Sequence, residues 1–281
     1  MLAGEAGEAP RMAMRILTTM ADVYAAPRLL DIESAHVDGC LCHGFSGLEF
    51  ARRLPDHGAR VVVPTTLNVG ALDLLHPGTH LGSEREVSRG RELMEAYLAM
   101  GCRPTWTCAP YQGEHRPATG AQVAWAESNA IVFANSVLGA RTNRYGDFID
   151  ICAAITGRAP ACGLHLEENR RGRVLVRLRG LPRRLLREPA LAPVLGYHVG
   201  RLCGTRVPVL EGLPTDTTED FLKALGAAAA SSGAVALFHV VGRTPEAATL
   251  EEAFQGEAPD EVLEVGLPEL ERARGLLSTA P

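Results

Sequence analysis

Apolar and polar residues follow two different patterns along the first half of the chain. Short apolar segments predict β-strands, and longer segments with apolar residues on one side predict α-helices. The predicted strands cover residues 28–32, 60–63 and 103–107, and the predicted helices cover residues 5–24, 47–54 and 84–100. Ser83 and Glu86 have the spacing of a capping box, which would begin the last of these helices. Strands that alternate with helices indicate an α/β fold with helices covering a parallel sheet.

The segment from Ala124 to Phe148 opens with one predicted long helix, which has an uncharged polar side and ends near Gly139. Apolar residues such as Ala130 and Phe133 fall on the other side at helical spacing. The uncharged side carries Ser128, Asn129, Asn135 and Ser136. Solvated helix faces usually carry charged residues, and Ser and Asn are poor helix formers, so we expect something polar to cover this side. A bound ligand and a polar seam against a neighbouring helix both satisfy that expectation.

Two arginines follow this helix closely. Gly139 offers a helix C-cap, and Arg141 and Arg144 come directly after it. Two guanidinium groups at this position can hold a carboxylate or a phosphate in bidentate fashion. The alternative is that both are ordinary surface residues.

Each of the three predicted strands is followed by a polar cluster. The clusters are Glu33 to Asp38, Thr65 to Asn68, and Cys108 to Tyr111. In a parallel sheet the carboxyl ends of the strands share one edge, and ligands bind beyond that edge. Each cluster alone is explained by ordinary turn chemistry, but three on one edge favour an enzyme.

The second half of the chain predicts a further α/β region. We expect a domain boundary near residue 158, with one domain over residues 1–158 and a second over residues 159–281. Residues 170–179 alternate arginine with apolar residues, which predicts a strand with one wet, basic face. A helix is expected at 221–232, a buried strand at 234–241, and a strand and a helix within 260–281. No aromatic residues interleave with the basic run, so we favour a solvated strand over a nucleic-acid site.

Composition narrows the function classes. The chain has 281 residues, 46% of them hydrophobic, and its net charge is −5, which argues against binding to nucleic acid or to an anionic membrane. No apolar run reaches the roughly 18 residues that span a bilayer. The first residues carry acids where a signal peptide has bases, so we expect a cytoplasmic protein. The seven cysteines are then mostly buried thiols, including the Cys40-Leu41-Cys42 pair and Cys162.

Several longer motifs occur in a fixed order along the chain. They are SAHVDG, VPTTLNVGALDLLHP, GCRPTWTCAPYQ, AWAESNAIVFANSVLGARTNRYGDF, AAITGR, GLHLEENR and GAVALFHVVGRTPEA. Together they resemble the catalytic large part of aconitase X. The sequence around His36, Asn68 and Trp106 is most similar to the bacterial branch, which resembles cis-3-hydroxy-L-proline dehydratase. The archaeal branch, similar to mevalonate 5-phosphate dehydratase, is a more distant relation.

This resemblance implies an aconitase-like α/β fold and a hydro-lyase that uses an iron–sulfur cluster, either [2Fe-2S] or [4Fe-4S]. Cys108 in the TCAPY motif matches a cluster ligand of the family. The family's other two cluster cysteines lie in motifs downstream of Pro281. Family members also use a small swivelling domain or subunit that supplies a serine base, and the chain shows no counterpart of it. The resemblance therefore implies an incomplete catalytic part.

Removal of water from a small hydroxy acid requires a base, a Lewis acid that helps hydroxide to leave, and fixed donors for the developing charge. The cluster at Cys108 would be the Lewis acid. The candidate substrate-binding residues are Thr65, Thr66, Asn68, Ser128, Asn129, Asn135, Ser136, Arg141 and Arg144. The candidates for proton handling, or for bracing the site, are Glu33, His36 and His165. We expect the cysteine, the strand-end residues and the uncharged helix side to converge on one pocket.

Three alternatives remain open from the sequence. The chain can be a non-catalytic or degenerate fragment that binds a partner domain or a small acid. It can act on mevalonate 5-phosphate in place of cis-3-hydroxy-L-proline. It can also be a metal-free dehydratase or isomerase on the same scaffold.

Overall fold

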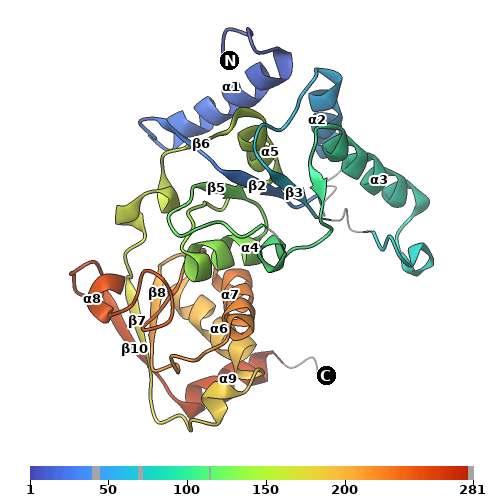
Figure 1. The fold of residues 1–281 in the computed structure, drawn as a ribbon. Coiled ribbons are helices and arrows are strands. Elements are labelled where there is room, and N and C mark those ends of the chain that lie inside the picture. The colour runs from blue at the N-terminus through green and yellow to red at the C-terminus, as the bar shows by residue number, and fades with distance from the viewer. Residues whose placement is uncertain (40–44, 69–71, 114, 278–281) are drawn as a thin grey trace. The chain divides into compact units, whose positions relative to one another are not determined.

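The structure is a computed structural model that describes residues 1–39, 45–68, 72–113 and 115–277 (Figure 1). The chain forms two compact units, which we call the first and the second unit. The first unit comprises Met1–Arg116, Ala121–Glu127 and Arg144–Cys162. The second unit comprises Pro117–Gly120, Ser128–Asn143 and Gly163–Pro281.

The first unit contains a four-stranded sheet in which all neighbouring strands are parallel. Its order is β4 (Arg103–Pro104), β3 (Thr65–Leu67), β2 (Ser34–Val37) and β5 (Val123–Trp125). A separate antiparallel pair joins β1 (Leu29–Asp31) to β6 (Arg158–Pro160). The expected parallel sheet is confirmed, so the carboxyl ends of its strands share one edge.

Four helices and one face of β2 form the core of the first unit. The helices are α1 (Glu8–Val23), α2 (Phe45–Asp56), α3 (Glu84–Ala99) and α5 (Asp147–Thr156). Ala35 and Val37 belong to this core together with Leu17 and Ile151. Because side chains alternate along a strand, Ser34 and His36 point to the opposite face of the sheet. Figure 1 shows α2 and α3 side by side at one end of this unit.

The predicted capping box is present at the start of α3. The Ser83 side chain accepts a hydrogen bond from the Glu86 backbone, and the Glu86 carboxylate accepts one from the Ser83 backbone. This arrangement satisfies two backbone donors that a helix start leaves open.

The second unit contains another parallel sheet. Its order is β10 (Glu261–Val265), β7 (Val174–Leu178), β8 (Pro208–Glu211) and β9 (His239–Val240). Its helices are α4 (Ser128–Phe133), which continues as a π-helix over Ala134–Leu138, α6 (Leu191–Cys203), α7 (Glu219–Gly233), α8 (Leu250–Ala253) and α9 (Leu267–Leu276). Figure 1 shows α6, α7 and α9 on one side of the sheet and α8 on the other. Leu175 and Val209 pack with Phe254 beside α8.

The remaining elements are single 3₁₀ turns. They lie at Pro77–Thr79, Pro110–Gln112, Gly163–His165, Glu167–Asn169 and Leu185–Arg187. Among the described residues, no helix is both long enough and apolar enough to cross a membrane.

The predicted long helix, expected to begin near Ala124 and to end at Gly139, is wrong at its start. Val123–Trp125 forms β5 because it pairs with β2, and Glu127 has a positive φ of 67°, which a right-handed helix does not allow. Gly139 ends the π-helix with a left-handed conformation, as expected. No helical residues follow until α5 begins at Asp147.

Three strand predictions are displaced or too long. Residues 60–63 form no strand, and the ladder begins after Pro64 at Thr65, where the chain pairs with β2. The strand expected at 234–241 is only His239–Val240. The strand expected at 103–107 likewise contains two residues. Only the segment 234–241 is largely buried, whereas residues 60–63 and 103–107 are exposed or partly buried. Ladder pairing decides which residues become strand.

The basic face predicted for residues 170–179 is present only in part, with the side chains of Arg173 and Arg179 41% and 57% exposed. Arg170 and Arg171 are buried, and both form ion pairs with carboxylates. Arg177 on β7 pairs with Glu211 on the neighbouring β8. These arginines therefore connect parts of the second unit.

Candidate functional site

A polar network lies on the first unit's sheet, with His36 of β2 at its centre. The His36 imidazole is fully buried, and its Nδ1 lies 2.7 Å from Thr66 Oγ1 on β3. Its Nε2 lies 3.2 Å from Glu127 Oε1. Asn68 Nδ2 donates a 2.7 Å hydrogen bond to the same oxygen. The network thus joins three strand ends at the carboxyl edge of a parallel sheet, where α/β proteins bind ligands.

Strand alternation explains which of the predicted threonines takes part. His36 and Thr66 are register partners, so their side chains point to the same face. Asn68 is two residues further on and shares that face. Thr65 points the other way, and its hydroxyl donates to the Val63 carbonyl at 2.9 Å. The structure therefore brings Thr66 and Asn68 to the network, and leaves Thr65 outside it.

Glu127 is the residue that the sequence analysis missed. It follows β5 with one residue between, at the same edge as the other network members. Burial raises the pKa of its carboxyl above the ordinary value, and hydrogen bonds and charge from His36 oppose that shift. Treating residues 124–138 as one helix concealed its position after a strand. Recognising that Val123–Trp125 pairs with β2 would have placed Glu127 after a strand.

A second carboxylate borders this edge. Asp147 Oδ1, at the start of α5, accepts a 3.0 Å hydrogen bond from the Asp38 backbone N–H. Burial and the nearby charge of Asp38 raise the pKa of Asp147 to about 6. One turn later, Asp150 is fully buried, and burial raises its pKa well above the ordinary value.

Aromatic rings lie beside the network. Trp125 of β5 is a register partner of His36, and the two rings pack edge to face with centroids 6.2 Å apart. The Trp125 Nε1–H donates to Ser34 Oγ at 3.3 Å. Tyr111 and His115 contact the same indole, with centroids 6.5 and 5.8 Å away. Burial lowers the pKa of His115. Tyr111 belongs to one of the predicted polar clusters, whereas Trp125 and His115 were not among the predicted site residues.

Other predicted residues of the first unit lie outside the network. Glu33 is exposed, and its backbone N–H donates to the Gln122 carbonyl at 2.8 Å. Arg144 is exposed before α5. Cys108 is also exposed, in the segment after β4. Their assignments to catalysis, substrate binding and metal binding stay predictions.

Asn135 and Ser136 are buried in a network of the second unit. Asn135 Oδ1 accepts from the Thr142 backbone and from Arg170 Nη1, both at 3.0 Å. Its Nδ2 donates to the carbonyls of Thr142 and Ala236. Ser136 Oγ accepts from the Phe238 backbone at 2.9 Å. The uncharged helix side is therefore covered by backbone groups, which corresponds to the polar seam.

Arg170 is the largest member of this second network. Its side chain is 1% exposed, donates to both carboxylate oxygens of Glu246 at 2.8 and 3.0 Å, and contacts the Leu164 carbonyl. Its Nη2 donates to the Asn135 carbonyl at 2.9 Å, so every nitrogen of the guanidinium has a partner, which offsets the cost of burying its charge.

The remaining predicted residues also belong to the second unit. Arg141 forms an ion pair with Glu167. His165 is buried, and burial together with Arg170 and Arg141 lowers its pKa to about 4, so it is neutral near pH 7. Ser128 is exposed and Asn129 is partly buried at the start of α4. The predicted convergence of these residues with the His36 network stays a prediction.

Cys108 differs from the other cysteines that the structure describes. Cys102, Cys152, Cys162 and Cys203 are buried, and burial raises the pKa of Cys102 and of Cys152 to about 12. Cys40 and Cys42 lie outside the described residues. Among residues that the structure describes, no three His, Cys, Asp or Glu side chains are grouped to hold a metal ion. Cys108 thus fits as one exposed thiolate ligand, and the described part of this chain lacks a complete ligand set.

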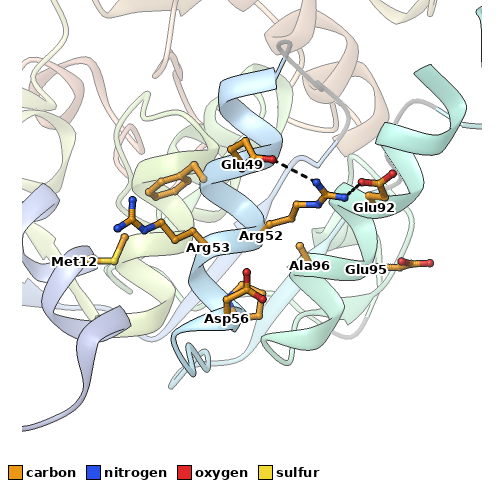
Figure 2. Close-up of a pocket in the computed structure, with 10 residues that line it drawn as sticks. Met12, Glu49, Arg52, Arg53, Asp56, Glu92, Glu95 and Ala96 are labelled. Carbon is orange, nitrogen blue, oxygen red and sulfur yellow. Dashed lines mark hydrogen bonds and ion pairs between the residues drawn. The ribbon is translucent and has the colours of Figure 1, made fainter. Parts of the chain in front are cut away.

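An open pocket of about 770 Å³ lies elsewhere in the first unit, between α2 and α3 with Met12 of α1 (Figure 2). Figure 2 shows Arg52 between Glu49 and Glu92, and both carboxylates pair with it. These side chains belong to helices and neutralise one another. The strand-end network has the buried, perturbed groups that characterise reactive sites, so we place the candidate site there.

Two family models match the chain. Residues 1–168 match the first domain of aconitase X, and residues 172–275 match its second domain. The chain belongs to the aconitase X family. A crystal structure of Thermococcus kodakaraensis aconitase X in its holo form covers 99% of this chain with a TM-score of 0.87 and 40% identity. This chain in turn covers 68% of that one.

Curated relatives of this aconitase X chain are named as dehydratases. The chain is 48% identical over its whole length to a cis-3-hydroxy-L-proline dehydratase of Pseudomonas aeruginosa, and 44% identical over 280 residues to one of Hypocrea jecorina. It is 44% identical over 247 residues to the phosphomevalonate dehydratase large subunit of Thermococcus kodakarensis. The chain spans about half the length of the first two relatives, namely 48% and 47%, and 60% of the third.

Proposed function

We propose that this chain provides the first two domains of a hydro-lyase that removes water from a small hydroxy acid, with cis-3-hydroxy-L-proline as the substrate. The observation that carries this proposal is the 48% identity, over the whole chain, to a protein named for that reaction. The polar network at the sheet edge supports it, because dehydration requires groups that hold and move protons.

The chemistry of the network favours an imino acid over a phosphorylated substrate. Phosphate groups are usually bound by arginine or lysine. Thr66, His36, Asn68 and Glu127 include no cationic Arg or Lys. Mevalonate 5-phosphate is the second candidate, since the Thermococcus large subunit is 44% identical to this chain.

In the proposed reaction, the chain's own residues bind substrate and handle protons. Thr66 and Asn68 fix the positions of His36 and Glu127 through hydrogen bonds. Trp125 and Tyr111 provide apolar surface that limits access of water to the network. An iron–sulfur cluster, when bound, supplies a Lewis acid for the leaving hydroxyl, and Cys108 would be one of its ligands. A small swivelling domain or subunit would complete the active site.

The test is turnover by protein supplied with iron, sulfide and the swivelling domain. We expect conversion of cis-3-hydroxy-L-proline to a pyrroline carboxylate, detected by mass spectrometry. The trans isomer is the matched control, because it carries the same groups with the hydroxyl on the other ring face. Turnover of mevalonate 5-phosphate alone would reassign the substrate. No turnover of either compound by an iron-loaded complex would reject the hydro-lyase proposal.

A further inference from the structure

The two oxygens of the Glu127 carboxylate differ in their surroundings. Oε1 receives the Asn68 amide N–H at 2.7 Å and lies 3.2 Å from His36 Nε2. Oε2 makes no hydrogen bond to any residue that the structure describes. The side chain is 9% exposed, whereas that of His36 is fully buried. A proton on this carboxyl therefore belongs on Oε2, because Oε1 already accepts from its donors.

His36 is unable to touch a substrate in this arrangement. Its ring is enclosed by Thr66 on one side, Glu127 on the other and the Trp125 indole beside it. Both ring nitrogens lie within hydrogen-bond distance of these neighbours. His36 therefore orients the Glu127 carboxylate, in the way that a buried partner orients a reactive side chain.

The backbone at Glu127 supports a specialised role. Its φ of 67° lies in the left-handed region, which non-glycine residues seldom occupy. Such conformations persist where the surrounding structure holds them, and they cluster at functional sites. Here the strained turn after β5 points the carboxylate back to His36 and Asn68.

We propose that Glu127 is the catalytic acid of this site and that its Oε2 delivers a proton to the leaving hydroxyl. This inference rests on the proposed dehydration. The Oε2–H bond breaks as the substrate C–O bond breaks, and the C–O electron pair stays on oxygen, so that water leaves. The base takes the proton from the carbon next to the carboxylate, and that C–H electron pair forms the double bond. The base then releases its proton to solvent, and Glu127 regains one from solvent.

The electrostatics agree with this geometry. Burial raises the pKa of Glu127, which keeps more of the carboxyl protonated at a given pH. The titratable groups that act on it are His36 and Asp38, and Glu127 in turn raises the pKa of Asp147 on α5. The charge of Asp38 raises the pKa of Glu127, and His36 lowers it.

The first test compares Glu127→Gln with Glu127→Asp and with Glu95→Gln, an exposed glutamate on α3, in the complete enzyme. We expect Glu127→Gln to lower kcat about 100-fold or more and to leave KM within about threefold. We expect the wild-type rate to decline at alkaline pH as the Glu127 carboxyl loses its proton, and the residual rate of Glu127→Gln to lack that decline. Glu127→Asp should recover part of the rate, and Glu95→Gln should match the wild type. Equal kcat for Glu127→Gln and wild type would overturn the proposal.

The second test changes the leaving group. In a proline that carries fluorine in place of the cis-3-hydroxyl, departure depends far less on a proton donor. Glu127→Gln should therefore slow elimination of fluoride less than tenfold. An equal loss with both substrates would assign Glu127 a merely structural role and overturn the proposal.

A third measurement separates this inference from the proposed reaction. The chain is labelled with ¹³C at the Glu carboxyl, and the resonance missing from Glu127→Gln is followed against pH. We expect a midpoint above the ordinary value of about 4.3. If the wild type turns over neither cis-3-hydroxy-L-proline nor mevalonate 5-phosphate, the proposed reaction fails. The titration then tests the protonation of Glu127 by itself. A midpoint at or below the ordinary value would overturn the acid role.

Discussion

At the residue scale, Asp147 shows how the fold places a carboxyl where its ionisation is costly. It lies in the first turn of α5, and its Oδ1 holds the Asp38 backbone N–H beyond the end of β2. Burial and the Asp38 charge raise its pKa to about 6. The protonated form is therefore favoured by folding, and ionisation above that pH works against the fold.

Asp147→Asn should remove this pH dependence, because the amide oxygen still accepts the Asp38 N–H but does not ionise. A group whose pKa is higher in the folded state than in the unfolded state stabilises the fold at pH values below its unfolded-state pKa. For Asp147 this stabilisation is lost as the pH rises through about 6. The free energy of unfolding of the variant, relative to wild type, should increase by about 2–3 kcal/mol between pH 4 and pH 7.5. Urea unfolding at both pH values measures it. An equal difference in unfolding free energy between variant and wild type at the two pH values would contradict the raised pKa of Asp147.

Cys108→Ser tests the metal-ligand assignment at the same scale. Serine is a poor ligand for iron in a cluster, so iron bound per chain after reconstitution should fall by half or more. Cys203→Ser is the control, because that thiol is buried in α6. Iron and sulfide analysis reads the result directly. Unchanged iron content in Cys108→Ser would remove this residue from the ligand set.

At the element scale, α6 and α7 pack closely enough that glycine is required between them. A Cβ added at Gly200 would lie 2.1 Å from Ser232 Oγ and 2.5 Å from the Ala229 carbonyl oxygen. Gly196 similarly faces the Leu225 carbonyl at 2.2 Å. Backbone atoms form part of both contacts, so a larger residue forces the helices apart.

Gly200→Ala should therefore destabilise the second unit by about 3 kcal/mol or more, even though alanine favours helices. Gly275→Ala on α9 is the matched control, since no heavy atom lies within 4 Å of its added Cβ. That variant should be neutral or more stable by about 0.5–1 kcal/mol. The stabilities of the two variants are compared by their midpoints of unfolding in urea. Equal midpoints would contradict the close packing of α6 on α7.

The elements also show where sequence reasoning succeeds. Helices with a clear apolar side and local start signals, such as α1 and α3, are predicted within a few residues. Alternation of strands and helices predicts a parallel sheet, but it assigns the wrong residues to it. Residues 29–31 form an antiparallel pair outside that sheet, and Ser34–Val37 and Thr65–Leu67, expected as polar clusters after strands, are themselves strands. The network's members are predicted in part: His36, Thr66 and Asn68 are found, and Glu127 is missed. Its position depends on pairing of β5 with β2, a contact that no local pattern encodes.

At the scale of the whole molecule, two α/β units carry different polar networks. The first unit's network has a carboxylate with solvent access, and the second unit's Asn135–Arg170–Glu246 network is hydrogen-bonded internally. Family membership and the named relatives suggest which reaction to test, and the first network suggests where in this chain to look for it.

The most direct measurement follows the ¹⁵N side-chain amide of Asn68 while cis-3-hydroxy-L-proline is titrated into the labelled, iron-loaded protein. Asn135, buried and fully bonded in the second unit, is the internal reference. We predict a saturable shift at Asn68 with little change at Asn135. Saturable shifts confined to the helical pocket around Arg52 and Glu92, or none at Asn68, would contradict the placement of the active site at this sheet edge.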